Sequence, residues 1–120
     1  MNMPTPADHG VTFEFTTIAR ELRAEPAYLR DGQAGRTLIR SSDLRIVIVA
    51  LKAGKTISEH HTNVSASVQT LAGHIRLQLP DRGEDVPVGT LLVLGAGLSH
   101  DVYAETDSVF LLTLGWSASP

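Results

Sequence analysis

Three histidines in two separate segments are the side chains best suited to chemistry. His60 and His61 are adjacent in GKTISEHHTN, residues 54–63, and His100 lies in LSHDVYA, residues 98–104. Imidazole binds divalent transition metals and exchanges protons near neutral pH. The chain has no cysteine, which excludes disulfides, thiolate metal sites and a cysteine nucleophile. The candidate chemistry is therefore metal binding or polar recognition by imidazole.

The strand pattern around His100 predicts that this histidine faces the protein interior. Alternate residues of a strand share one face, and His100 shares its face with Leu98, Val102 and Ala104. A buried imidazole needs partners for its ring nitrogens, usually a carbonyl, a carboxylate or a metal. The pattern is compatible with a hydrogen-bonded core histidine and with a metal ligand.

The same alternation separates the two adjacent histidines. His60 shares a face with Thr62, whereas His61 shares the opposite face with Glu59. The two imidazoles therefore cannot both point inward unless a β-bulge intervenes. Without a bulge, we expect His60 to line a pocket and His61 to face solvent.

The elements that must position these histidines are short strands. Apolar runs separated by turn residues predict about eight of them, at residues 36–40, 44–52, 56–62, 66–72, 74–79, 90–94, 98–104 and 108–116. In HIRLQL, residues 74–79, the alternation places Ile75, Leu77 and Leu79 on the buried face and His74 on the polar face. Such spacing is typical of an antiparallel sandwich or barrel, so we expect an all-β fold.

One short helix is predicted before the strands. The segment TTIARELRAEP, residues 16–26, offers Thr16 or Thr17 as its N-cap, Ile18 and Leu22 for the core, and Pro26 at its end. We therefore divide the chain into an N-terminal arm at 1–15, a helix and loop at 16–35, and a barrel at 36–117.

Two of the strands are apolar on both faces. LRIVIVAL, residues 44–51, and SVFLLTL, residues 108–114, do not alternate with polar residues. A strand of a small antiparallel sandwich needs only one buried face, so the second must be covered by the helix or by another subunit. A homodimer is the economical hypothesis.

The spacing of glycines and histidines resembles the two motifs of the cupin superfamily. The first motif has a glycine, His-x-His, a Glu and a second glycine, and its positions hold Gly54, His60, Thr62, Ala66 and Gly73. The second has a glycine, Pro-x-Gly and a histidine, and its positions hold Gly89, Gly95, Gly97 and His100. The chain is thus similar to small, single-domain, type-2, RmlC-like bacterial cupins. The resemblance implies a double-stranded β-helix, that is a jelly-roll barrel, with a pocket inside.

The resemblance also implies a metal site, of which this chain keeps an incomplete ligand set. The family's metal is usually held by the two histidines and the Glu of the first motif and by the histidine of the second. Those positions are here His60, Thr62, Ala66 and His100. A metal that activates water or oxygen normally needs three protein ligands. His61 is the preferred third donor, if the strand bulges, and Gln69 and Asn63 are alternatives.

The implied pocket is roomier and less charged than a complete cupin site, because alanine replaces the Glu. Its expected lining, besides the histidines, comprises Thr62, Ala66, Val68, Leu77 and Val102. We therefore expect binding of a small, mostly apolar molecule, a divalent metal (Zn, Fe, Mn, Ni or Cu), or both. The alternatives are a metal-dependent dioxygenase or isomerase that uses His60, His100 and a third ligand, and an inert structural dimer. Whether the protein is an enzyme is left open.

Composition argues against several partners. The 120 residues carry 10 basic and 13 acidic side chains, a formal net charge of −3, with no basic run for nucleic acid or anionic lipid. The longest apolar run is too short to span a bilayer, and the N-terminus has no signal-peptide pattern. We expect no nucleic-acid or membrane partner and a cytoplasmic location.

Overall fold

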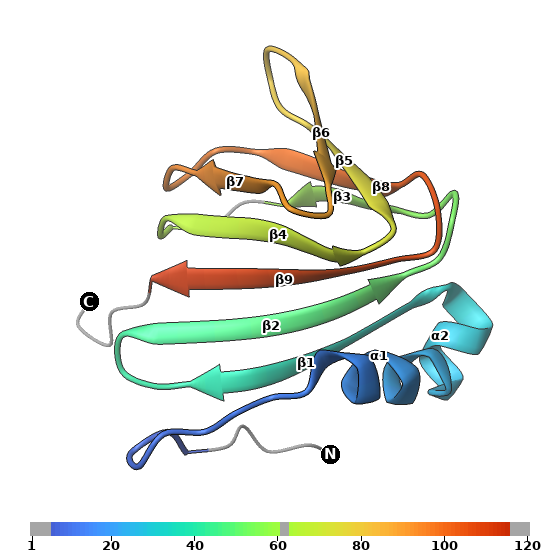
Figure 1. Ribbon diagram of the computed structural model, residues 1–120. Coiled ribbons are helices and arrows are strands. Elements are labelled where there is room, and N and C mark those ends of the chain that lie inside the picture. The colour runs from blue at the N-terminus through green and yellow to red at the C-terminus, as the bar shows by residue number, and fades with distance from the viewer. Residues whose placement is uncertain (1–5, 61–62, 116–120) are drawn as a thin grey trace.

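The computed structural model describes residues 6–60 and 63–115, with residues 59 and 60 as backbone only. It contains two short helices followed by nine strands among these residues (Figure 1). Their bounds are α1 Phe15–Arg23, α2 Pro26–Asp31, β1 Gln33–Arg40, β2 Leu44–Leu51, β3 Thr56–His60, β4 Ala66–Ala72, β5 His74–Gln78, β6 Gly83–Pro87, β7 Leu91–Leu94, β8 His100–Ala104 and β9 Ser108–Gly115. None of the described helices is long and apolar enough to cross a membrane.

The strands form two antiparallel sheets that face each other. One sheet has the order β1-β2-β9-β4-β7 and the other β3-β8-β5-β6. The chain passes from one sheet to the other at every connection except β1 to β2 and β5 to β6, so strands distant in sequence become neighbours. This is the predicted all-β jelly roll with a helix at its N-terminal end.

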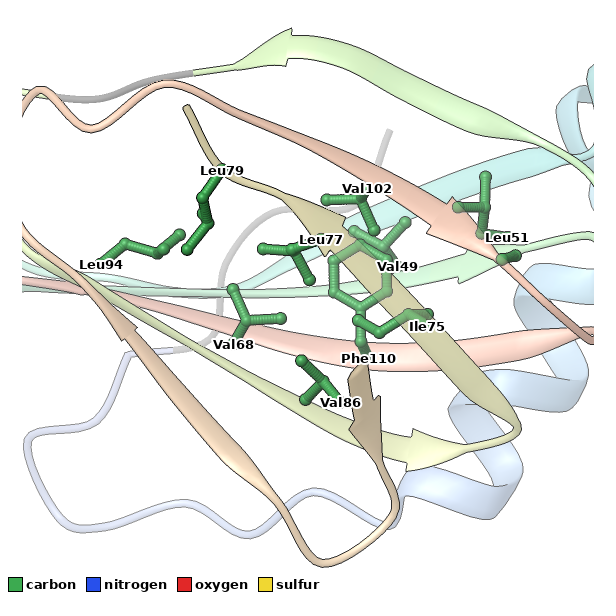
Figure 2. Packing of buried hydrophobic residues seen from close by; sticks show 11 residues of the cluster. Val49, Leu51, Val68, Ile75, Leu77, Leu79, Val86, Leu94, Val102 and Phe110 are labelled. Carbon is green, nitrogen blue, oxygen red and sulfur yellow. The ribbon is translucent and has the colours of Figure 1, made fainter. Parts of the chain in front are cut away.

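The main hydrophobic core fills the space between the two sheets. Figure 2 shows side chains from both sheets converging there, among them Leu77 of β5 and Phe110 of β9. Ile75 and Leu77 have 0% exposed surface and Leu79 has 3%, which confirms the alternation predicted for residues 74–79. Burial of each such side chain stabilises the fold by about 1.5–3 kcal/mol.

The second apolar face of β2 and β9 is covered by the helices of the same chain. Ile18 and Leu22 of α1 and Tyr28 of α2 belong to a second hydrophobic cluster together with Ile48 of β2 and Val109 of β9. The helices lie against the outer side of the sheet near β1 and β2 (Figure 1). Covering this face therefore does not require a second subunit, and the homodimer stays a prediction.

The start of the first helix differs from the predicted one. α1 begins at Phe15, and the N-cap is Glu14, whose carboxylate accepts hydrogen bonds from the backbone N–H groups of Thr16 (3.1 Å) and Thr17 (3.0 Å). The Thr17 hydroxyl also donates to this carboxylate, and this bond lowers the pKa of Glu14 most. Thr16 or Thr17 as N-cap was wrong because the longer glutamate side chain reaches both orphan N–H groups.

A second helix, α2, was not predicted. The sequence indicates one helix that ends near Pro26, but the proline instead occupies the first turn of α2, where its missing N–H costs nothing. Gly32 ends α2 in the left-handed conformation, with φ +75°, and β1 starts directly afterwards at Gln33. The loop expected at the end of the segment 16–35 is therefore wrong, because only Gly32 separates α2 from β1.

Strand β6 was also missed. Residues 80–85 read as a turn, yet Gly83–Pro87 pair with β5 at the edge of the four-stranded sheet. Only Val86 of this strand is buried, at 1% exposure. An edge strand with one inward apolar side chain carries almost no alternation, which explains why the pattern did not reveal it.

Arg36 of β1 forms ion pairs with both helical segments. Its guanidinium bonds Glu21 of α1 at 2.8 Å and Glu25, the N-cap of α2, at 3.4 Å. The arginine side chain is 18% exposed, whereas that of Glu21 is 54% exposed, so solvent weakens this attraction. The pair contributes mainly to the orientation of the helices over the second cluster.

Gly73, the closing glycine of the first motif, makes the turn from one sheet to the other. It has φ +80°, and a Cβ at this position would lie 2.3 Å from the Asp107 carbonyl oxygen and 2.8 Å from Cα of Ser108. Ser108 is fully buried and its hydroxyl accepts from the backbone N–H of His74 at 3.0 Å. Two crossings between the sheets therefore pack against each other at this turn.

We predict that Gly73→Ala destabilises the protein much more than Gly54→Ala. Both glycines have a positive φ, but a Cβ at Gly54 meets nothing within 4 Å. Both substitutions carry a left-handed backbone cost of about 1–2 kcal/mol. Gly73→Ala adds overpacking, roughly 1–3 kcal/mol more. Urea unfolding measures the difference, and equal losses in the two variants would contradict the tight packing at this turn.

Candidate ligand pocket

A cavity of about 250 Å³ opens between the two sheets. Strands β2, β4 and β9 of one sheet and β3 and β8 of the other supply most of its wall, and β1 supplies the remainder. The lining comprises Gln33, Arg45, Val47, Val49, Ile57, Val68, His100, Val102, Phe110, Leu112 and Leu114. The wall is therefore largely aliphatic, with a few polar side chains.

His100 lies in this wall with its ring oriented by the backbone. It is 8% exposed, as the alternation of β8 predicted, and its Nδ1 lies 3.0 Å from the carbonyl oxygen of Leu98. A carbonyl oxygen only accepts, so Nδ1 carries the proton of this bond. In the uncharged ring, Nε2 then carries the lone pair, which is suited to accept a hydrogen bond or to bind a metal.

An irregularity in β3 changes which residue lies opposite His100. Ile57 pairs with Val102, and unbroken antiparallel pairing from that point would place Glu59 opposite His100. The register shifts between Ile57 and His60, and the backbone of His60 pairs with that of His100 instead. A bulge is thus present just before the adjacent histidines, and it brings two motif positions far apart in sequence directly opposite each other.

The other predicted lining residues divide into three groups. Val68 and Val102 lie in the cavity wall. Leu77 is fully buried in the main core, and Ala66, 6% exposed, pairs with Leu114 at the cavity. Thr62 lies outside the described residues.

The described candidates for a third metal donor point away from the cavity. Gln69 and Asn63 are both exposed, and neither lines the cavity. His61 lies outside the described residues, and for His60 only the backbone is described. Within the described part of the chain, no three His, Asp or Glu side chains are grouped as a metal site would require. No carboxylate from that part lines the cavity, so these donors alone do not fit a three-ligand site.

Sequence reasoning missed two polar lining residues, Gln33 of β1 and, with more consequence, Arg45. On β2 it shares a face with Val47 and Val49, which also line the cavity. The signal was available in LRIVIVAL, where period two places Arg45 on one of the two apolar faces. Because both faces of this run are apolar, the pattern alone does not show which face lines the cavity.

Comparison with solved structures shows the fold clearly. A conserved protein of unknown function from Streptococcus pyogenes is 25% identical with a TM-score of 0.75, over 99% of this chain and 98% of the other. An RmlC-like cupin from Desulfovibrio desulfuricans is 26% identical with a TM-score of 0.64, over 69% and 81% of the two chains. A salicylate 1,2-dioxygenase mutant from Pseudoaminobacter salicylatoxidans is 19% identical with a TM-score of 0.72, over 87% of this chain and 34% of the other.

These likenesses agree with the two motifs. The structure has the cupin fold, and by that fold the chain belongs to the cupin superfamily, as the glycine and histidine spacing predicted. No protein-family model matches the sequence, and no curated protein matches it either. At 19% identity, the dioxygenase is a likeness of fold alone.

The hydrogen bonds of two histidines predict opposite tautomers. His100 should carry its proton on Nδ1, because that nitrogen donates to the Leu98 carbonyl. His74, on the polar face of β5, should carry it on Nε2, which lies 3.3 Å from the acceptor-only carboxylate of Asp85. Long-range ¹H–¹⁵N correlation spectra distinguish the two forms. An Nε2-protonated, Nδ1-unprotonated ring at His100 would contradict the described pocket geometry.

Proposed function

We propose that this protein binds a small, largely apolar molecule in the cavity between its two sheets. The observation that carries the proposal is the cavity itself, about 250 Å³ in volume and walled mainly by Val, Ile, Leu and Phe. Ligand sites are typically concave and mostly apolar, with a few convergent polar groups. This volume lies just below the typical range of about 300–1,000 Å³, so the expected ligand is about the size of one or two rings.

The polar groups give such a ligand its orientation. His100 lies in the wall, and the Leu98 carbonyl orients its ring through Nδ1, so Nε2 is the ring atom suited to accept a hydrogen bond. Its position in an apolar wall strengthens each hydrogen bond, because little water competes there. Apolar burial supplies most of the affinity, and the imidazole selects molecules with a donor at the matching place.

We predict that Val47→Trp weakens binding of the neutral, two-ring fluorescent probe 1-naphthylamine by at least about tenfold, or about 1.4 kcal/mol. Val47 is half-buried and lines the cavity, so the larger side chain fills the space that the probe needs. Val93→Trp is the matched control, since Val93 is 64% exposed on β7. Fluorescence titration gives both affinities. Equal binding by the two variants, or no binding by the unmodified protein, would refute the proposal.

A metal-dependent dioxygenase or isomerase is the second candidate function. The observation in its favour is the register of β3 and β8, which pairs the backbones of His60 and His100. With His61 as third ligand, these residues would hold a divalent metal that supplies Lewis-acid or oxygen chemistry. The dioxygenase neighbour supports compatibility of the fold with such chemistry. Arg45 opposes it, because a guanidinium in the same cavity repels a cation.

For these reasons we expect the purified protein to hold less than one equivalent of Zn, Fe, Mn, Ni or Cu. Elemental analysis of protein prepared without chelator or affinity tag measures the content, alongside His60→Ala and His100→Ala. One full equivalent of metal that is lost in both variants would favour the metal-dependent enzyme over the binding protein. Metal that persists in both variants would show that neither histidine is a ligand.

We also propose a location, an absent partner and an oligomeric state for this protein. The protein acts in the cytoplasm, binds no nucleic acid and forms a homodimer. The formal charge of −3 supports the second expectation. Exposed Leu91 and Val93 on edge strand β7 support the third, because association would remove this apolar surface from water.

A further inference from the structure

Arg45 lies inside the barrel through the alternation of β2. Its neighbours on the same strand face are Val47 and Val49, and its partner across the ladder to β9 is Leu114. All three of these apolar residues line the cavity, and Arg45 itself is half-buried. The guanidinium therefore belongs to the cavity wall and not to the outer surface of the sheet.

The cavity has a cation and no anion among its described lining residues. Arg45 is the one lining side chain there with a permanent charge, and Gln33 and His100 are the other polar groups. None of the described lining side chains is acidic, so a negative group of a ligand would meet the guanidinium without repulsion from a described carboxylate.

A carboxylate is the anion that matches both the chemistry and the size of this site. The guanidinium has five N–H donors in a rigid plane, and two of them pair with the two oxygens of a carboxylate. With five donors, Arg45 can keep its interactions with the protein and still present a pair to a ligand. The aliphatic wall contacts the apolar body of the same molecule, whereas a phosphate ester or sugar would leave polar groups against Val and Leu side chains.

We propose that the ligand is a small apolar carboxylate, such as an aromatic or branched aliphatic acid, whose carboxylate pairs with Arg45. This inference rests on the proposed binding function and adds the ligand class to it. The apolar body lies against Val47, Val49 and Phe110, and His100 contacts a second polar group where the molecule has one. Arg45 is then the residue that separates acids from their neutral analogues.

The test compares phenylacetate with phenylacetamide, which has nearly the same shape but no charge. Both are titrated by saturation-transfer NMR and by displacement of 1-naphthylamine. We expect the unmodified protein to prefer phenylacetate by about tenfold or more. Arg45→Met should abolish this preference through weaker binding of phenylacetate, with little change for phenylacetamide and for the neutral probe. Arg45→Lys, which keeps the charge but loses the planar fork, should retain part of it.

Arg20→Met is the matched control for net charge. Arg20 is exposed on α1, outside the cavity lining, so its loss changes the charge of the protein equally without touching the site. Equal weakening of phenylacetate by Arg20→Met and Arg45→Met would overturn the carboxylate site. Equal affinity of the unmodified protein for acid and amide would also overturn it, and that comparison needs no variant to fold.

The two proposals fail in different ways. If the neutral probe binds but acid and amide do not differ, the cavity binds ligands and the carboxylate inference is wrong. If neither the probe nor the two compounds bind, the proposed binding function fails, and the carboxylate inference fails with it. Thermal unfolding of each variant, followed by circular dichroism, verifies that changed affinity does not reflect loss of the fold.

Discussion

The burial of both faces of β2 and β9 is the constraint on which the rest of this structure depends. On the inner face, residues such as Val49 and Phe110 meet the opposite sheet, and on the outer face Ile48 and Val109 meet the helices. Apolar surface on either side would otherwise remain in contact with water, at about 25 cal/mol per Å². The second sheet therefore buries the inner face of this central pair of strands, and the two helices bury its outer face.

The candidate site follows from incomplete filling of the inner face. Where β2 and β9 run past the end of the tightly packed core, valine and leucine line a cavity, and Arg45 and His100 enter its wall. Some positions of the cupin motifs serve the fold, and others lie at the candidate site. Gly73 allows the crossing between sheets, whereas the positions that hold the family's remaining ligands are occupied here by Thr62 and Ala66.

Prediction from sequence succeeded where local periodicity was strong. The alternation in residues 74–79 and 98–104 placed Ile75 and His100 on the buried face, because successive side chains of a strand must point to opposite sides. It failed where neighbours far along the chain decide the structure. Strand β6 exists because β5 offers it a ladder, and α2 begins at the proline that was expected only to end a helix.

By itself, the sequence determined the all-β class, the cupin spacing of the glycines and histidines, and the inward face of His100. These are properties of short segments, and period two or a glycine turn is enough to encode them. Only the tertiary structure decided the bulge that pairs His60 with His100, and the presence of Arg45 in the same cavity as that histidine. Both depend on the register between strands, which is set by packing across the barrel and leaves no mark within either segment alone.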